Sequence, residues 1–254
     1  MNRFVLSFVL IVASFSLVRA DVPVEMDSLT AQATRTYAAG EYEQALALFD
    51  SVNTRYSSPS LLYNIGNCYF KLNDIPHAIL FYERALRLAP GDADVKANLE
   101  LARQSVVDRV NELPAFNLGS TWGKIRGGND PDQWARRSLW ACLLLFLALT
   151  TAVVVRLRIL KRALFALSGL LFFATLLSVS FAAYRNSEVK DDSEAIVMTA
   201  KVDVRSEPRT NTTVLFVLHK GTKVIVLKTE NQWSEVQLAN GSVGWMPPST
   251  IERI

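Results

Sequence analysis

The chain of 254 residues carries 27 Lys and Arg against 24 Asp and Glu, which gives a formal net charge of +3. This length leaves room for two modest domains. So small a charge argues against nucleic-acid binding, which needs a basic face across a whole domain. Hydrophobic residues make up 50% of the chain and mean hydropathy is +0.18, which is high for a soluble protein. With two cysteines, Cys68 in a helical pattern and Cys142 in an apolar run, no disulfide framework is expected.

The N-terminal segment, residues 1–20, has the pattern of a targeting signal rather than of a folded element. Arg3 is followed by an apolar run from Phe4 to Val18 and by a small residue, Ala20, at the expected cleavage position. These features predict a secretory signal peptide. An uncleaved transmembrane anchor is the alternative. Both interpretations place the segment after Ala20 outside the cytoplasm.

Residues 60–90 contain the strongest motif of the N-terminal half, a pair of helices with small and aromatic residues at fixed spacing. Its positions are Leu62, Ile65, Gly66 and Tyr69 in the first helix, Ala78, Tyr82 and Ala85 in the second, and Pro90 at the end. This order resembles the tetratricopeptide repeat. One repeat earlier, Ala45 and Phe49 occupy the places of Ala78 and Tyr82. We therefore expect a tetratricopeptide repeat domain of about two and a half units over residues 21–111.

The resemblance implies a concave groove lined by the first helix of each pair. The polar side chains expected on this face are Ser60, Tyr63, Asn64, Asn67, Lys71 and Asn98. Grooves of this family often bind peptides, and asparagines there can hydrogen-bond a peptide backbone. A polar face that only contacts solvent is the alternative. The sequence does not decide between the two.

Two apolar runs, residues 138–155 and 163–184, follow a linker and juxtamembrane segment at 112–137. Each run is free of charged residues and approaches the ~20 residues that a helix needs to span a bilayer. Buried core helices are the alternative, but those are shorter, about 10–14 residues, and rarely come as a pair around a basic loop. The pattern predicts a transmembrane helical hairpin.

The loop between the two runs, residues 156–162, reads RLRILKR and contains four basic residues. Short loops rich in Lys and Arg stay in the cytoplasm. Together with the signal peptide, this predicts a membrane protein in which the segments before and after the hairpin both lie outside the cytoplasm.

After a charged linker at 185–194, residues 195–254 contain five short β-rich runs separated by turn residues, the pattern of a small all-β barrel. The segments that carry a resemblance to the bacterial SH3-like domain are residues 204–208, 218–224, 233–236 and 241–246. In such a domain Trp233 and Trp245 are candidates for a ligand surface. A place in the core is the alternative for each.

The whole chain resembles the BatE-type proteins of the Bacteroides aerotolerance group. The match is carried by Tyr63-Asn64-Ile65-Gly66-Asn67, by residues 85–90 and by residues 94–100, within the shared order of domains. This resemblance implies an envelope protein that works beside von Willebrand A-type membrane proteins and a MoxR-type ATPase. It also implies a link to stress or oxygen tolerance.

The expected fold class is a multidomain membrane protein with an all-α repeat, a transmembrane hairpin and a small all-β SH3-like barrel. The leading functional hypothesis is a non-enzymatic scaffold that binds protein or peptide partners, and a peptidoglycan-binding envelope module is the alternative. A hydrolase is disfavoured because Cys68 and Cys142 lie on helices and His77 and His219 lie in separate domains. No catalytic, metal or cofactor site is expected.

Overall fold

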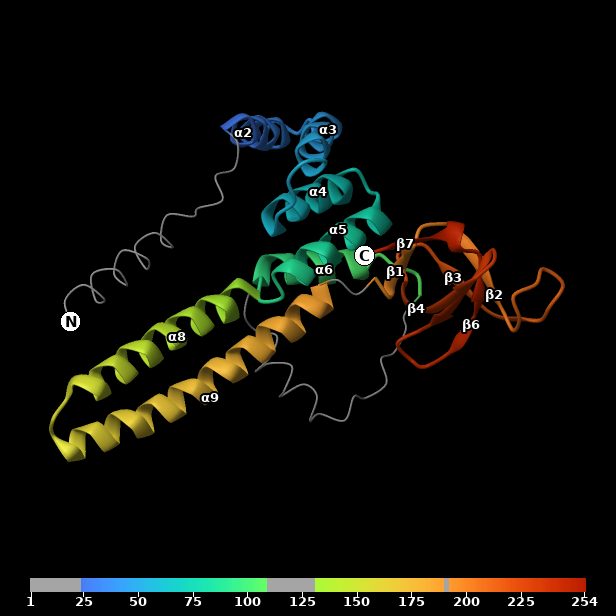
Figure 1. Cartoon of the computed structure of the whole chain (residues 1–254). Helices are drawn as coiled ribbons and strands as arrows, with labels where there is room; N and C mark the ends of the chain where they lie inside the picture. The colour runs from blue at the N-terminus through green and yellow to red at the C-terminus, as the bar shows by residue number, and fades with distance from the viewer. Residues whose placement is uncertain (1–23, 109–130, 190–191) are drawn as a thin grey trace.

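The computed structural model describes residues 24–108, 131–189 and 192–254 (Figure 1). These residues form, in chain order, a stack of helices, a pair of long antiparallel helices and a seven-stranded antiparallel sheet. The predicted fold class is confirmed: a tetratricopeptide-like helical region, an apolar helical pair and a small all-β domain. The predicted signal peptide and residues 112–130 of the predicted linker lie outside the described residues.

The helical stack consists of α2 (Val24–Ala38), α3 (Tyr42–Asn53), α4 (Pro59–Lys71), α5 (Ile75–Leu88) and α6 (Ala93–Arg103). Local chemistry sets these boundaries. The side chains of Ser58, Asp74 and Asp92 accept hydrogen bonds from backbone N–H groups in the first turns of α4, α5 and α6. These bonds satisfy donors that the start of a helix leaves unpaired. Gly40, with φ of 86°, makes the left-handed turn that separates α2 from α3.

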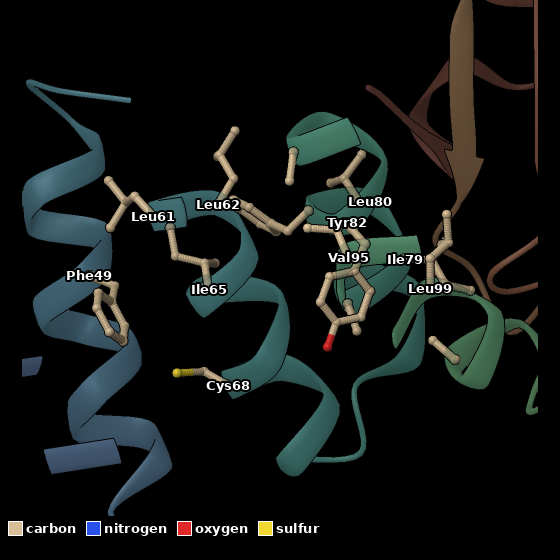
Figure 2. Packing of buried hydrophobic residues seen from close by; sticks show 14 of the residues in the cluster. Phe49, Leu61, Leu62, Ile65, Cys68, Ile79, Leu80, Tyr82, Val95 and Leu99 are labelled. Atoms are coloured by element: carbon tan, nitrogen blue, oxygen red, sulfur yellow. The ribbon is translucent and has the colours of Figure 1, made fainter. Parts of the chain in front are cut away.

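The helices pair as α2 with α3 and α4 with α5, and α6 follows as a single helix. Gly66 allows α4 to approach α5 closely, because a Cβ at this position would lie 2.7 Å from the ring of Tyr82. Figure 2 shows Tyr82 of α5 among the apolar side chains that fill the space between the helices, with Ile65 on α4 and Phe49 on α3 of the neighbouring pair. Gly66 and Tyr82, a small and an aromatic position of the repeat pattern, therefore pack against each other.

The long helices α8 (Pro131–Val154) and α9 (Arg158–Val189) run side by side and project away from the other two parts (Figure 1). Residues 136–154 and 158–183 are long and apolar enough to cross a membrane, and only 11% of each stretch is buried. A core helix of a soluble protein would be mostly buried. Ala148, Ala152 and Ser168 are buried where the two helices meet, since small side chains let helix backbones approach.

The connection between α8 and α9 is shorter than the predicted loop. Only residues 155–157 are not helical, because α9 already begins at Arg158. Lys161 and Arg162 therefore lie in the first two turns of α9. The basic residues still gather at the end of the hairpin that is farthest from the helical stack and the sheet (Figure 1).

The sheet consists of β1 (Glu194–Val197), β2 (Lys201–Arg205), β3 (Val214–His219), β4 (Lys223–Glu230), β5 (Trp233–Gln237), β6 (Val243–Met246) and β7 (Ile251–Arg253), with a short 3-10 helix at Pro248–Thr250. The strand order is β3-β2-β6-β5-β4-β1-β7. Strands β2 and β7 were not among the five predicted runs. β2 alternates charged and apolar residues, and β7 has only three residues.

One apolar core is shared by strands from both halves of the sheet. Val204 of β2, Leu218 of β3 and Val197 of β1 belong to the same buried cluster, although β3 and β1 lie far apart in the strand order. The sheet must therefore curl to enclose this core, as expected of a small barrel-like domain.

The sheet packs directly on the C-terminal end of the helical stack. Ile196 of β1 and Ile254 are buried in the same cluster as Ile79 of α5 and Leu99 of α6. The last unit of a helical repeat needs a cap over its apolar face. Among the described residues no further helix pairs with α6, and the β1–β7 edge of the sheet covers this end of the stack instead.

Candidate functional site

Three of the six predicted groove residues belong to one hydrogen-bonded network. The side-chain amide of Asn98 on α6 donates to the Tyr63 hydroxyl at 3.0 Å and to Asn67 Oδ1 at 2.9 Å, both on α4. The Tyr82 hydroxyl on α5 donates to the same Asn67 oxygen at 2.7 Å. The network therefore fixes both asparagine side chains and ties three helices together.

The network leaves complementary groups unused. Asn67 Oδ1 accepts two hydrogen bonds, and its NH₂ group has no acceptor among the described residues. Asn98 Nδ2 donates two hydrogen bonds, and Asn98 Oδ1 accepts none from the residues that the structure describes. One amide donor group and one amide acceptor thus remain available, which are the partners that the C=O and N–H groups of a peptide backbone require.

The other predicted groove residues lie on α4 outside this network. Asn64 is half-buried, and its side chain makes no hydrogen bond within the described ranges, whereas Ser60 and Lys71 are exposed. Tyr37 on α2, which packs against the core of the helical stack, was not among the predicted groove residues. Partial burial, followed by the neighbouring Cys68, Tyr42 and Tyr63 side chains, raises the pKa of Tyr37. Its hydroxyl therefore stays protonated at neutral pH.

The two tryptophans of the sheet differ in their surroundings. Trp245 in β6 is buried but does not belong to the core cluster, which takes the adjacent Met246, so the Trp245 ring faces the opposite side of the sheet. The ammonium group of Lys228 lies 4.9 Å from its ring centroid. Trp233, at the start of β5, is half-buried. Trp233 is therefore the more accessible of the two for a ligand.

A chain of ion pairs crosses the junction between the helical stack and the sheet. Glu83 on α5 is buried and binds Arg103 of α6 at 2.6 Å and Lys223 of β4 at 3.0 Å. Lys223 also binds Glu194 of β1 at 2.9 Å, and Glu194 lies 3.4 Å from Arg87 of α5. A buried carboxylate needs such partners because its charge is otherwise costly in a nonpolar environment.

Asp108 makes a second polar link across the junction. Its Oδ1 lies 2.7 Å from His219 Nδ1, and its Oδ2 accepts hydrogen bonds from the His219 backbone N–H at 2.6 Å and the Thr222 hydroxyl at 2.8 Å. Partial burial raises the pKa of Asp108, but the hydrogen bonds from His219 and Thr222 outweigh it and hold the pKa below its ordinary value. The carboxylate is therefore ionised at neutral pH.

A cleft of about 470 Å³ opens beside these ion pairs. One wall comes from the helical stack and includes Glu100, Val106 and Asp108, and the other comes from the sheet and includes Ile225 and Gln237. The volume falls within the range of small-ligand sites, and domain interfaces are a common location for such sites. Neither the ion pairs nor the cleft was predicted from the sequence, because the partners that cross the junction lie far apart in the chain: Glu83 and Lys223 are 140 positions apart, and Arg87 and Glu194 are 107 apart.

The described ranges also contain cysteine, histidine and acidic side chains away from the cleft. No group of three or more His, Cys, Asp or Glu side chains in these ranges could hold a metal ion. Burial, followed by the charge of Asp50, raises the pKa of the Cys68 thiol to about 12, so this thiol is a poor nucleophile. His77 pairs with Asp74 at 2.8 Å at the start of α5.

Comparison with protein families agrees with this architecture. Residues 59–92 match the tetratricopeptide repeat, and residues 200–252 match the bacterial SH3 domain. Among curated proteins, no sequence matches the chain. The first match spans α4 and α5, and the second spans β2 through most of β7. The chain therefore joins a tetratricopeptide repeat segment to a bacterial SH3 domain through a pair of apolar helices.

Proposed function

We propose that the protein is a non-enzymatic scaffold, anchored in the bacterial inner membrane, that binds an extended segment of a partner protein along α4 and α6. A tetratricopeptide segment and a bacterial SH3 domain are typically binding modules, and the apolar hairpin between them supports membrane anchoring. The observation that carries the proposal is the arrangement of Asn67 and Asn98. Their mutual hydrogen bond leaves an amide donor and an amide acceptor on neighbouring helices.

This arrangement favours recognition of main chain over side chain. Asn67 and Asn98 are already held in place by Tyr63 and Tyr82, so little side-chain entropy is lost when a ligand binds. Asn64, one turn before Asn67, supplies a further amide. A groove of neutral amides bonds backbone groups of any sequence, and specificity must then come from neighbouring surfaces.

The test uses the full chain in lipid nanodiscs and peptides selected against it by display. Replacing a single backbone N–H of the bound peptide by N-methyl should abolish binding, while changing the side chain at the same position should have a small effect. Asn67→Ala and Asn98→Ala should each weaken binding by about tenfold, on the order of one good hydrogen bond. Gln32→Ala, an exposed amide on α2, serves as the matched control. Unchanged affinity in both asparagine variants would contradict the proposal.

We assign both binding modules to the periplasmic side of the membrane. In support, they pack on each other at one end of the hairpin, and Arg156, Arg158, Lys161 and Arg162 lie at the other end, which the charge rule places in the cytoplasm. A phosphatase fused after Ile254 should be active, and one inserted within residues 156–162 should be inactive. The reverse pattern would overturn this orientation.

For the identity of the partner, we propose von Willebrand A-type membrane proteins that work with a MoxR-type ATPase in stress or oxygen tolerance. The support is the resemblance to BatE-type proteins carried by residues 63–67 and 85–90. Photo-crosslinking from the exposed Ser60 and Lys71 positions in intact membranes identifies what occupies the groove. Products that contain neither protein class would remove this part of the proposal.

Peptidoglycan binding is the second candidate function, and the bacterial SH3 match over residues 200–252 favours it. The ligand surface would include Trp233, the more accessible tryptophan. The full chain in detergent should then sediment with purified sacculi, and Trp233→Ala should reduce the bound fraction. A chain that stays in the supernatant would exclude this candidate and leave the scaffold proposal unaffected.

A further inference from the structure

We propose that the cleft between the helical stack and the sheet is a second recognition site, which takes a lysine side chain of a partner protein. Neither Asn67 nor Asn98 lines this cleft. A test of the cleft is therefore independent of the main-chain recognition proposed above. It exists only where the two modules are packed together, because each module supplies one wall.

The cations of the cleft are already paired. Arg103 and Lys223 both bind the buried carboxylate of Glu83, and Lys223 also binds Glu194. The cleft is also lined by three carboxylates, Glu100, Asp108 and Glu194, so an anionic ligand would meet a net negative charge. An anionic ligand is therefore disfavoured.

Two acids of the cleft are not balanced in this way. Glu100 on α6 is exposed and has no ion-pair partner within the described residues. Asp108 is held by the Thr222 hydroxyl and by the ring and backbone of His219, which are neutral donors when the imidazole is uncharged. Within the described residues, neither of these two carboxylates on the helical wall of the cleft forms an ion pair with a Lys or Arg side chain.

The rest of the lining suits an aliphatic stem. Val106, Ile79 and Ile225 line the same cleft, and Ile225 is among the exposed large hydrophobic residues of the sheet. A lysine side chain combines an apolar stem with a terminal ammonium group, and it can bury the stem along apolar surface while the charge meets carboxylates. The ammonium group would lie between Glu100 and Asp108.

The experiment uses the full chain in lipid nanodiscs with methyl-labelled isoleucine. The probe is Nα-acetyl-lysine N-methylamide, and the control ligand is the norleucine analogue, which has the same four-carbon stem without the charge. The lysine probe should shift the methyl signals of Ile79 and Ile225 with a dissociation constant on the order of millimolar. The signal of Ile65, buried between α4 and its neighbours, should stay unchanged.

A single substitution tests whether a carboxylate of the cleft binds the ammonium group. Glu100→Gln removes an exposed carboxylate without breaking a pair, so the fold is retained, and binding of the lysine probe should weaken roughly two- to fivefold, as expected for a partly solvated ion pair. Glu43→Gln, an exposed acid on α3, is the matched control. Equal shifts with lysine and norleucine probes, no shift at Ile79 and Ile225, or no effect of Glu100→Gln would each overturn the proposal.

Discussion

The surface around Asn67 and Asn98 and the junction are both polar, but they are built from different interactions. Around Asn67 and Asn98 the groups are neutral and lie on consecutive helices of one module. At the junction, Glu83 and Lys223 are charged and come from two modules. Neutral amides leave hydrogen-bonding capacity for a ligand, whereas the buried ion pairs use theirs to hold two domains together. Unused hydrogen-bonding groups thus characterise the first region, whereas paired charges that fix the relative position of the two modules characterise the second.

The largest effect on stability is expected for Tyr82, whose hydroxyl group donates a hydrogen bond to Asn67. Tyr82→Ala removes a fully buried ring and should lower the free energy of unfolding of the helical stack by about 3–5 kcal/mol. Labelling of the Cys68 thiol in urea, in the full chain with Cys142→Ser, measures this opening, because Cys68 is buried in the same core.

Tyr82→Phe is the matched control, since it keeps the ring against Gly66 and removes only the hydrogen bond to Asn67. Its expected loss is about 1 kcal/mol. If Tyr82→Phe destabilises the stack as much as Tyr82→Ala does, the hydrogen bonds around Asn67, and not the packing of the ring, stabilise this part of the stack.

The next effect concerns the junction. Lys223→Met keeps the aliphatic stem but deprives Glu83 of one of its two cations and Glu194 of a partner. We expect a loss of about 1–3 kcal/mol, below the full value for breaking a buried pair because Arg103 still binds Glu83. Hydrogen exchange should rise in α5, β1 and β4, because Lys223 of β4 binds Glu83 of α5 and Glu194 of β1.

Lys220→Met is the control for Lys223→Met, because Lys220 is an exposed lysine of the same turn without an ion-pair partner in the described residues. It should change stability by no more than about 0.5 kcal/mol. A double-mutant cycle with Glu83→Gln isolates the coupling energy. A coupling near zero would show that apolar contacts of Ile196 and Ile254 hold the junction without the ion pair.

The sequence predicts these two regions unequally, for a physical reason. The packing of Gly66 on Tyr82 and the position of Asn67 follow from helical spacing within about fifteen residues, and the family pattern contains them. The junction does not follow from any local period. Glu83, Arg103 and Lys223 each look like ordinary surface charges, and only the folded chain brings Lys223, 140 positions after Glu83, within 3.0 Å of it.

Two details of the fold, strand β7 and the connection between α8 and α9, also differ from the sequence-based expectation. Strand β7 is three residues long and pairs only with β1 at the edge of the sheet. It is too short for an alternation of apolar and polar residues to predict it. The short connection at 155–157 arises because Leu157 to Arg162 contains no helix-breaking residue, and α9 continues through the basic cluster. Charge indicated a boundary there, but charge alone does not end a helix.

Acidification should destabilise the junction before it affects the neutral hydrogen bonds around Asn67 and Asn98. The pKa of Asp108 is lowered in the folded chain by its hydrogen bonds to His219 and Thr222, despite partial burial. Its contribution to stability is therefore present above the unfolded pKa of about 4 and is lost as the pH falls through the lower folded value. Hydrogen exchange of His219 and Thr222 should rise in that window. Asp108→Asn should remove this pH dependence, and a variant that still shows it would assign the acid response to another group.

The smallest effect on stability, and the clearest separation of binding from folding, is expected at Asn64. Its side chain makes no hydrogen bond with the rest of the described chain, so Asn64→Ala should change the free energy of unfolding by no more than about 0.5 kcal/mol. Asn67→Ala leaves Tyr82 and Asn98 without a shared acceptor and should lose about 1–3 kcal/mol. Both variants should weaken peptide binding. If Asn64→Ala binds peptide like the unaltered chain, the ligand lies across Asn67 and Asn98 only, nearer the sheet than the groove of α2 and α4.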